Sequence, residues 1–212
     1  MKELKYTLIA DGRSDMTLLK IIKWSLDDLY PMLPNDGCYA DFKYLKEPPR
    51  KLKDKVLAAK QYYPFDILFI HRDAESVHAR MIIQRTQEIN IELPEDDKDR
   101  IICIIPVKKM ETWLLIDEDA IKKAAHNRNY KGSINLPLIR TLEKESQPKD
   151  LLHTLLKETS GLKGRNLNKF NTERKVHLVA EYIEDFSPLR NLFAFQAFEA
   201  ELKRAVDRYL EN

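Results

Sequence analysis

Cysteine is scarce in this sequence, because only Cys38 and Cys103 occur among 212 residues. Neither belongs to a Cys-x-x-Cys pair, which excludes a zinc or dithiol redox site built on paired cysteines. We expect Cys103, within the apolar run Ile101–Ile105, to be a small core residue, Cys38 to be a loop thiol, and no disulfide between them. Four of the histidines have no metal-ligand spacing, so no zinc site is expected from them (His78, His126, His153 and His177).

Long apolar runs are also absent. No stretch approaches the roughly 20 apolar residues that a membrane-spanning helix needs. The first residues lack the long hydrophobic region of a secretory signal, so we expect a cytoplasmic protein with no membrane partner. No excess of one charge exists either, since 36 basic against 34 acidic residues leave a formal net charge of +2. This balance neither indicates nor excludes a nucleic-acid partner, and local clusters have to decide.

The sequence does contain an alternation of short apolar runs and helical patterns. The apolar runs predict four strands, at Lys5–Ala10, Tyr39–Leu45, Leu68 to His71 or Arg72, and Arg100–Val107. Apolar residues at helical spacing predict the helices between them, from Ser14 to Leu29, over Lys51–Tyr62 and over Ser76–Asn90. This order predicts an α/β fold with a mainly parallel four-stranded sheet flanked by helices.

The rest of the chain predicts helices only. They are expected from Asp117 to about His126, from Pro148 to Thr159, around Val176–Ile183, and from Ser187 onward. The last helix has an apolar stripe that indicates a core position rather than a base-stacking surface (Phe195, Phe198, Leu202, Val206 and Tyr209). We expect residues 1–126 to form the α/β domain and residues 127–212 to form a helical extension packed on it, in a single compact unit.

Acidic residues follow three of the predicted strands. Asp11 and Asp15 come after the first, Asp73 and Glu75 after the third, and Glu111 shortly after the fourth. Parallel strands have their carboxyl ends at one edge of the sheet, so these carboxylates are expected to converge there. Like charges this close need compensation, and a hard divalent cation such as Mg²⁺ or Mn²⁺ fits an oxygen-rich ligand set. The alternative is that Asp73 and Glu75 only cap the helix that follows them.

Several of these segments resemble motifs of the Toprim superfamily, the metal-dependent catalytic module of topoisomerases, primases and OLD-type nucleases. Asp11–Asp15 is similar to its Glu-Gly-x-x-Asp loop, and Asp73-Ala74-Glu75 is similar to its Asp-x-Asp motif. Small stand-alone bacterial Toprim-like proteins also contain segments similar to Glu111–Asp117, Pro148-Lys149 and Pro188–Phe198. The sequence departs from the family pattern at two positions, because Asp11 stands where the family has Glu and Glu75 stands where it has Asp. The carboxylate side chain is therefore one methylene shorter in the first loop and one methylene longer in the second.

The resemblance implies a Toprim-like Rossmannoid fold and Mg²⁺-assisted or Mn²⁺-assisted cleavage of a nucleic-acid phosphodiester. It implies four metal-binding and catalytic residues (Asp11, Asp73, Glu75 and Glu111). Asp11 is alternatively the general base. Around them, Gly12 permits a tight turn, and Asp15 caps the first helix or stands behind the ligands. Arg72 and His71 are placed to reach a substrate phosphate, and the alternative for His71 is a side chain tucked under the sheet edge.

Clusters of basic residues are the candidates for nucleic-acid binding. Lys108 and Lys109 directly follow the fourth strand. Residues 161–175 hold five basic residues against one acid (Lys163, Arg165, Lys169, Arg174 and Lys175). A further run is interrupted by Glu47 and Asp54 and overlaps a surface helix (Lys43, Lys46, Arg50, Lys51, Lys53 and Lys55). Such clusters can follow a phosphate backbone.

These residues and the resemblance together predict a nuclease in bacterial defence against phage or plasmids. The chain has no Gly-x-x-x-x-Gly-Lys-Ser/Thr loop, so the ABC-type or AAA-type ATPase often paired with such modules would be another chain from a neighbouring gene. The sequence leaves homodimer formation open. The alternative function is a non-catalytic module that binds a nucleotide, a nucleic-acid end or a partner protein. The long helical tail and the acid spacing in the first loop disfavour a phosphoacceptor receiver domain, and that loop excludes an Asp-x-Asp-x-Thr phosphatase.

Overall fold

A fully parallel sheet with the strand order β2-β1-β3-β4 forms the centre of the protein. The computed structural model describes residues 2–211, apart from the side chains of Arg13, Glu95 and Asp96. The four strands are β1 (Leu4–Ile9), β2 (Asn35–Tyr39), β3 (Ile67–His71) and β4 (Ile101–Ile104). The apolar sequences of β3 and β4 match burial on both faces of the sheet, as central parallel strands require, whereas the edge strand β2 is polar and contains no buried residue. The predicted α/β class with a parallel four-stranded sheet is therefore confirmed.

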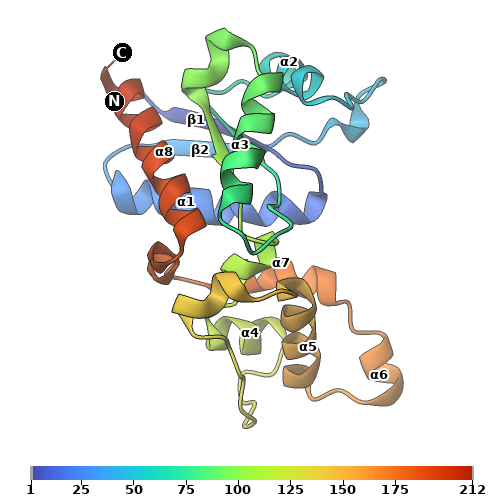
Figure 1. Cartoon of the computed structure of the whole chain (residues 1–212). Coiled ribbons are helices and arrows are strands. Elements are labelled where there is room, and N and C mark those ends of the chain that lie inside the picture. Colours follow the sequence, from blue (N-terminus) through green and yellow to red (C-terminus); the bar gives the residue numbers. More distant parts are fainter. Residues whose placement is uncertain (1, 212) are drawn as a thin grey trace.

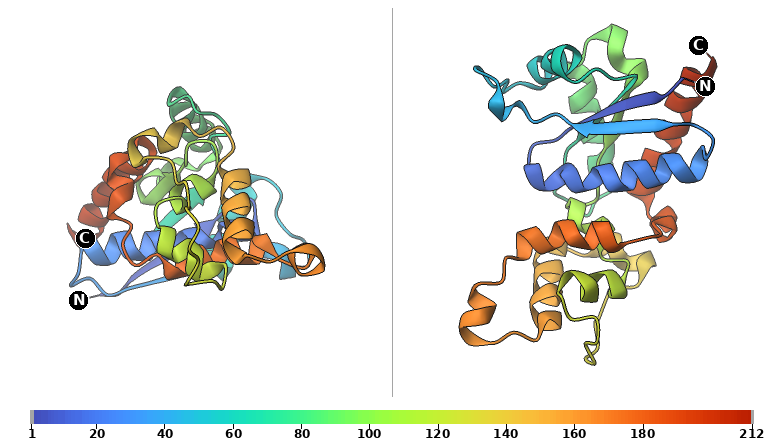
Figure 2. Two further views of the ribbon diagram at one scale, coloured as in Figure 1. Left: turned by 90° about the horizontal axis from the view of Figure 1, so that it is seen from below. Right: turned by 180° about the vertical axis from the view of Figure 1, so that it is seen from behind.

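Helices cover both faces of this sheet (Figures 1 and 2). On one face, Tyr6 of β1 and Phe69 of β3 make an edge contact, and Phe69 also packs on Phe198 of α8 (Phe193–Glu211). Next to α8 on this face lies α1 (Leu18–Leu29), whose last turn is joined to it by a 2.7 Å hydrogen bond from Tyr30 to Asp207. The opposite face is covered by α2 (Leu52–Tyr62) and α3 (Arg80–Glu92), which contact each other.

A group of helices lies beyond the carboxyl edge of the sheet (Figure 1). It contains α4 (Glu118–Ala124), α5 (Pro148–Ser160), the short α6 (Gly164–Asn168) and α7 (Thr172–Tyr182). We call this group the helical lobe. The packing does not follow a boundary at residue 126, because α4 packs on α5 and α7 of the lobe, whereas α8 returns to β4. Apolar stripes on both α4 and α8 direct each helix to the nearest available apolar surface.

The second strand was predicted wrongly at Tyr39–Leu45, since the chain pairs with β1 over Asn35–Tyr39 instead. Asp36-Gly37 indicated a loop, but Gly37 belongs to the strand because the Tyr6 ring occupies the space of a side chain. A Cβ atom on Gly37 would lie 2.0 Å from that ring. Cys38 is consequently an exposed strand residue rather than a loop thiol, and it is free, as is the partly buried Cys103.

Two further boundaries differ from the predictions. The third helix begins at Arg80 rather than Ser76. The fourth strand ends at Ile104 rather than Val107. The buried residues that follow it are held by backbone hydrogen bonds, such as the one that the Ala74 N–H donates to the Pro106 carbonyl at 3.1 Å. The helix over Pro148–Ser160 ends at Gly161 in the left-handed conformation (φ +65°), as its glycine predicted. No helix in the described part of the chain combines the length and apolar character that crossing a membrane requires.

Candidate active site at the carboxyl edge of the sheet

A pocket of about 360 Å³ lies where β1 and β3 end. Five of its lining residues come from the segments that follow these strands, one is the last residue of β3 and one comes from α3 (Asp11, Asp15, Arg72, Asp73 and Glu75; His71; Arg85). The parallel sheet brings these loops together, because both strands point toward the same edge. Four of the five predicted acids therefore meet in one pocket, whereas Glu111 is not among its lining residues.

The loop after β1 is closed by its own aspartate. The Asp15 carboxylate accepts hydrogen bonds from the Gly12 N–H at 3.0 Å and from the Ser14 hydroxyl at 3.1 Å. This arrangement caps the short 3-10 helix Arg13–Thr17 that leads into α1. Asp11 has no such local partner, and its side chain is 70% exposed, with the Lys55 amine at 2.9 Å. Asp15 is thus tied to its loop, whereas Asp11 faces solvent and a lysine from α2.

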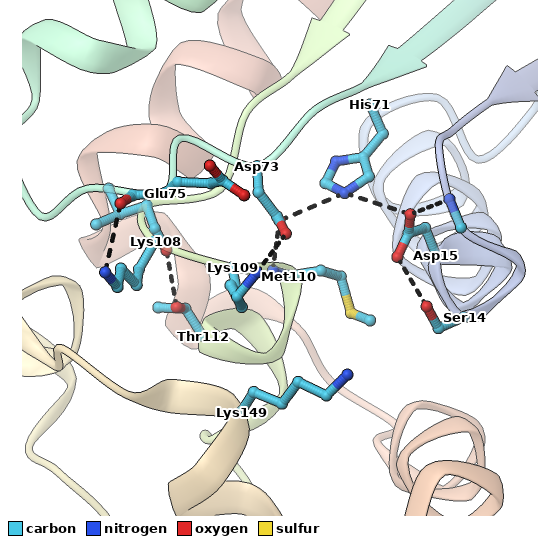
Figure 3. Close-up of polar contacts among 12 residues, drawn as sticks. Ser14, Asp15, His71, Asp73, Glu75, Lys108, Lys109, Met110, Thr112 and Lys149 are labelled. Atoms are coloured by element: carbon cyan, nitrogen blue, oxygen red, sulfur yellow. Dashed lines mark hydrogen bonds and ion pairs between the residues drawn. The ribbon is translucent and has the colours of Figure 1, made fainter. Parts of the chain in front are cut away.

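His71 connects the two acidic loops (Figure 3). Its Nδ1 donates a hydrogen bond to the Ile104 carbonyl at 3.0 Å, because a carbonyl oxygen can only accept. Its Nε2 therefore faces the acids, 3.5 Å from Asp73 Oδ1 and 3.8 Å from Asp15 Oδ2. His71 is only 3% exposed, so it lies under the sheet edge rather than in solvent. From there its ring orients the two carboxylates.

Asp73 lies deeper in the pocket than the other acids of its loop. Its carboxylate accepts the Met110 N–H at 2.9 Å and lies 3.6 Å from the Lys109 amine. Burial raises the pKa of this carboxyl above its ordinary value, and His71, Lys109 and the Met110 N–H lower it without cancelling the effect of burial. Because α3 begins only at Arg80, Asp73 and Glu75 do not cap that helix. The alternative of simple capping thus fails at this position.

Glu75 and Lys108 lie opposite each other in left-handed backbone conformations, with φ of +54° and +61°. The Glu75 N–H donates to the Lys108 carbonyl at 2.9 Å, and the Lys108 amine donates to the Glu75 carbonyl at 3.3 Å. The Glu75 carboxylate points away from this pair, is 64% exposed and lies 4.0 Å from Arg85. Left-handed non-glycine residues are costly and tend to be kept at functional sites. Lys108 consequently helps to hold the acidic loop in shape, and the phosphate contact expected of it stays a prediction.

Glu111 lies in the 3-10 helix Met110–Leu114 and is only 6% exposed. Burial raises the pKa of its carboxyl, the Asp73 carboxylate raises it further, and Lys149 and Lys109 lower it. Lys149 extends from the start of α5 toward the Asp73 side of the site (Figure 3). Glu111 is thus an electrostatic neighbour of Asp73 that is buried outside the pocket lining.

Three cations compensate the acids from other elements. Lys55 of α2 contacts Asp11, and Lys109 approaches Asp73. Arg85 of α3 is hydrogen bonded to Glu88 of the same helix at 2.7 Å, and its guanidinium also lies 4.0 Å from Glu75. Arg72 contributes less, because its guanidinium pairs with Glu92 at 3.2 Å. The sequence reasoning missed Arg85, and the only signal was an arginine early in the helix after the acidic motif. Lys55 was assigned to the nucleic-acid run, but it contacts the site itself.

The acids of the pocket can be compared with the ligands that a divalent cation uses. Among the described residues, no three His, Cys, Asp or Glu side chains are arranged to hold a metal ion by themselves. Mg²⁺, however, usually keeps several waters and uses one or two carboxylates together with substrate phosphates. Asp73, Glu75 and Asp11 supply oxygen donors of this kind in one pocket. The chemistry of the donor set fits, and the cation would replace contacts to Lys109, Arg85 and Lys55.

The other predicted nucleic-acid residues lie outside this pocket. They occupy α6, its flanking turns and the start of α7, and most of them are exposed (Lys163, Arg165, Lys169, Arg174 and Lys175). The amine of Lys175 lies over the Phe170 ring, 5.8 Å from its centre.

No protein-family model, no curated protein and no solved structure matches this chain. A function therefore has to be argued from the pocket and its surroundings.

Proposed function

We propose that this chain is a Mg²⁺-dependent, Toprim-like nuclease that hydrolyses nucleic-acid phosphodiesters, with Mn²⁺ as an alternative metal. One observation carries the proposal. Acids from two separate strand ends, Asp11, Asp73 and Glu75, line a single pocket with the guanidinium of Arg85. The raised pKa of the Asp73 carboxyl supports it, because burial leaves the charged carboxylate poorly solvated and a bound cation would stabilise that form.

In this proposal Asp73 and Glu75 would hold the metal, and Asp11, which now pairs with Lys55, would be a further ligand. The bound cation would polarise the phosphoryl group and neutralise charge on the attacking and leaving oxygens. Glu111 is buried and supports this site through its electrostatic interactions with Asp73, Lys149 and Lys109. Since Glu111 does not line the pocket, its role as a direct ligand is the weaker part of the predicted set.

The remaining residues act on substrate and on geometry. Arg85 lines the pocket and offers a fork of donors suited to the non-bridging oxygens of a phosphate. Lys109 is placed to contact the same phosphate once it leaves Asp73. Asp11, exposed and ionically paired, is the alternative proton acceptor for the attacking water. His71 and Asp15 fix the loops, because they hydrogen bond to the backbone of β4 and of the first loop.

The wider setting belongs to the same proposal. The enzyme acts in the cytoplasm, in defence against phage or plasmids, and an ABC-type or AAA-type ATPase from a neighbouring gene couples nucleotide hydrolysis to cleavage. A homodimer is compatible with this arrangement.

A second candidate is a non-catalytic binding module. It is favoured by one observation, namely that the pocket acids already have cationic partners in Lys55, Arg85 and Lys109. Such a module would use the pocket for a nucleotide, a nucleic-acid end or a partner protein without breaking a bond.

A cleavage assay separates the two candidates. Supercoiled, linear and single-stranded DNA and tRNA are incubated with Mg²⁺ or Mn²⁺ and with wild type, Glu75→Gln or Asp36→Asn. Asp36 is an exposed carboxylate near the amino end of β2 and serves as the matched control. Removing a group that stabilises the transition state costs about 100-fold in rate, so Glu75→Gln should lose cleavage to this extent while Asp36→Asn keeps it. Equal cleavage by both variants would reject the nuclease.

A further inference from the structure

Positive charge is concentrated in two short parts of the chain. The first basic arm, residues 42–53, and the second basic arm, residues 161–175, each contain five basic residues and one acidic residue. Together they contribute eight net positive charges, whereas the whole chain carries only +2. All other residues taken together are therefore net acidic, and the arms are the places where a polyanion would bind.

Both arms are attached to the acidic loop after β1. The first arm follows β2 and leads into α2, where Lys55 reaches Asp11 at 2.9 Å. The second arm leads into α7, where His177 and the hydroxyl of Thr17 form a 2.6 Å hydrogen bond. Figures 1 and 2 show that the two arms project on the same side of the molecule, one from the sheet and one from the helical lobe. The acid pocket belongs to the sheet edge between them.

Two cations of each arm are exposed and lack an ion-pair partner among the described residues, whereas Lys43 of the first arm pairs with Asp41 at 3.6 Å. Lys46 and Arg50 of the first arm and Lys163 and Arg165 of the second are exposed, and none of them forms an ion pair with another described residue. The contrast with the cations of the pocket is informative, because Lys55 and Lys109 lie close to pocket acids and Arg85 is paired with Glu88, 4.0 Å from Glu75. The pocket cations balance the site, and the arm cations remain available for a phosphate backbone.

Each arm has an aromatic ring beside a lysine, exposed in the first arm and half-buried against the core in the second (Phe170). Tyr44 of the first arm is 78% exposed, and the Lys43 amine lies 4.8 Å from the centre of its ring. In the second arm, Lys175 lies over Phe170 at 5.8 Å. Cations next to aromatic faces are the combination by which proteins bind single strands, because phosphates pair with the cations while unstacked bases stack on the rings.

We infer that the two basic arms hold one single-stranded nucleic acid across the acid pocket. This inference rests on the proposed nuclease function for the statement that the strand is cut there, and it names the substrate as a polynucleotide long enough to reach both arms. A mononucleotide or a short oligonucleotide would contact one arm only. A duplex keeps its bases stacked on one another and leaves Tyr44 without a partner.

The test measures binding in EDTA, so that no cleavage occurs. Fluorescence anisotropy follows labelled oligo(dT) of about 30 and about 6 nucleotides and a duplex of the longer length, lengths chosen around known single-strand site sizes. The variants are Lys46→Glu with Arg50→Glu, Lys163→Glu with Arg165→Glu, and Tyr44→Ala. The matched control is Arg140→Glu with Lys144→Glu, an exposed pair in the 3-10 helix Ile139–Lys144.

Each arm variant should weaken binding of the long strand at least about 10-fold and make its salt dependence shallower, since each lost phosphate contact reduces the slope by about one. Tyr44→Ala should weaken the long strand more than the duplex, and the control should bind like wild type. The inference is overturned if either arm variant behaves like the control, if the duplex binds as tightly as the single strand, or if wild type binds no strand.

These outcomes are separate from those of the cleavage assay. Wild type that binds through both arms but leaves DNA intact with Mg²⁺ and Mn²⁺ would reject the nuclease and keep the arms as a binding surface. Cleavage that depends on Glu75 in a protein whose arm variants bind normally would reject the arms alone. Melting curves of all variants report whether a loss of binding comes from unfolding, and the exposed positions of the substituted residues predict unchanged curves.

Discussion

Asparagine in place of Asp73 should raise the melting temperature of the metal-free protein at neutral pH. The substitution removes a carboxylate whose pKa is raised chiefly by burial, despite the lowering effects of His71 and Lys109. The asparagine oxygen can still accept the Met110 N–H, which donates to the aspartate at 2.9 Å. The variant therefore keeps the hydrogen bond and loses the cost of holding a poorly solvated charge.

The pH dependence follows from the sign of this shift. Below the unfolded pKa of about 3.9, Asp73 is protonated in both states and adds no penalty. As the pH rises, the unfolded chain loses its proton first, so the folded state binds more protons and the free energy of unfolding falls. Asparagine does not titrate. The advantage of Asp73→Asn should thus be small near pH 4 and complete at neutral pH.

The same substitution should have the opposite effect when a divalent cation is present. Removing an unfavourable charge from a functional pocket stabilises by on the order of 1 kcal/mol, or about 2–4 °C for a chain of this length. Mn²⁺ at ten times its dissociation constant should stabilise wild type by about 1.4 kcal/mol, or about 3–6 °C, because it binds only the folded state. Asp73→Asn should not respond to Mn²⁺. The difference between the melting temperatures of the variant and wild type should therefore become smaller or change sign when Mn²⁺ is added.

Thermal melts between pH 4 and pH 7.5, in EDTA and in a Mn²⁺ series, provide the measurement. Asp36→Asn is the control for loss of an exposed carboxylate and should behave like wild type. A variant that melts below wild type at pH 7 in EDTA would show that the contacts from Lys109 and His71 outweigh burial. An unchanged Mn²⁺ response in Asp73→Asn would show that the cation binds elsewhere, and the site assignment would be refuted.

Glu111→Gln should also raise the melting temperature in EDTA at neutral pH, because burial raises the pKa of this carboxyl, but it should keep the Mn²⁺ response, since Glu111 does not line the pocket. Thr17→Val removes the 2.6 Å hydrogen bond to His177 and should lower the melting temperature by about 2–8 °C, from a cost of about 1–2 kcal/mol, with a parallel loss of cleavage. Gly37→Ala should cost about 1–3 kcal/mol by overpacking against the Tyr6 ring, and denaturant melts should show recovery when Tyr6→Leu is added.

The sequence predicted the parts of the site that depend on local patterns. The apolar runs located β1 and β3, and the parallel order then required Asp11 and Asp73 to meet at one edge, as they do. Asp15 closes a loop with residues one and three positions before it, a contact that spacing alone indicates. These features are readable because each depends on neighbours in the sequence or on one general rule of sheet topology.

Features that depend on distant packing were not readable. β2 was placed too late because Gly37 is explained only by the Tyr6 ring on the neighbouring strand. The acidic partner of Lys55 lies 44 positions away in the sequence, and no local pattern distinguishes it from the surface lysines around it. The return of α8 to the sheet depends on Phe198 meeting Phe69, a pair joined only in the folded chain.

The cations around the pocket indicate how substrate and metal would depend on each other. Lys55 and Lys109 lie close to acids that a metal would need, and Arg85, paired with Glu88, lies 4.0 Å from a third. A phosphate entering the pocket competes for the same cations, because they pair with any nearby anion, and its arrival frees the carboxylates for a divalent ion. The metal in turn lowers the repulsion between the acids and the phosphate. By linkage these two effects would be equal, so under the proposed function metal and nucleic acid would bind more tightly together than separately, and the protein without substrate would keep its acids paired with its own cations.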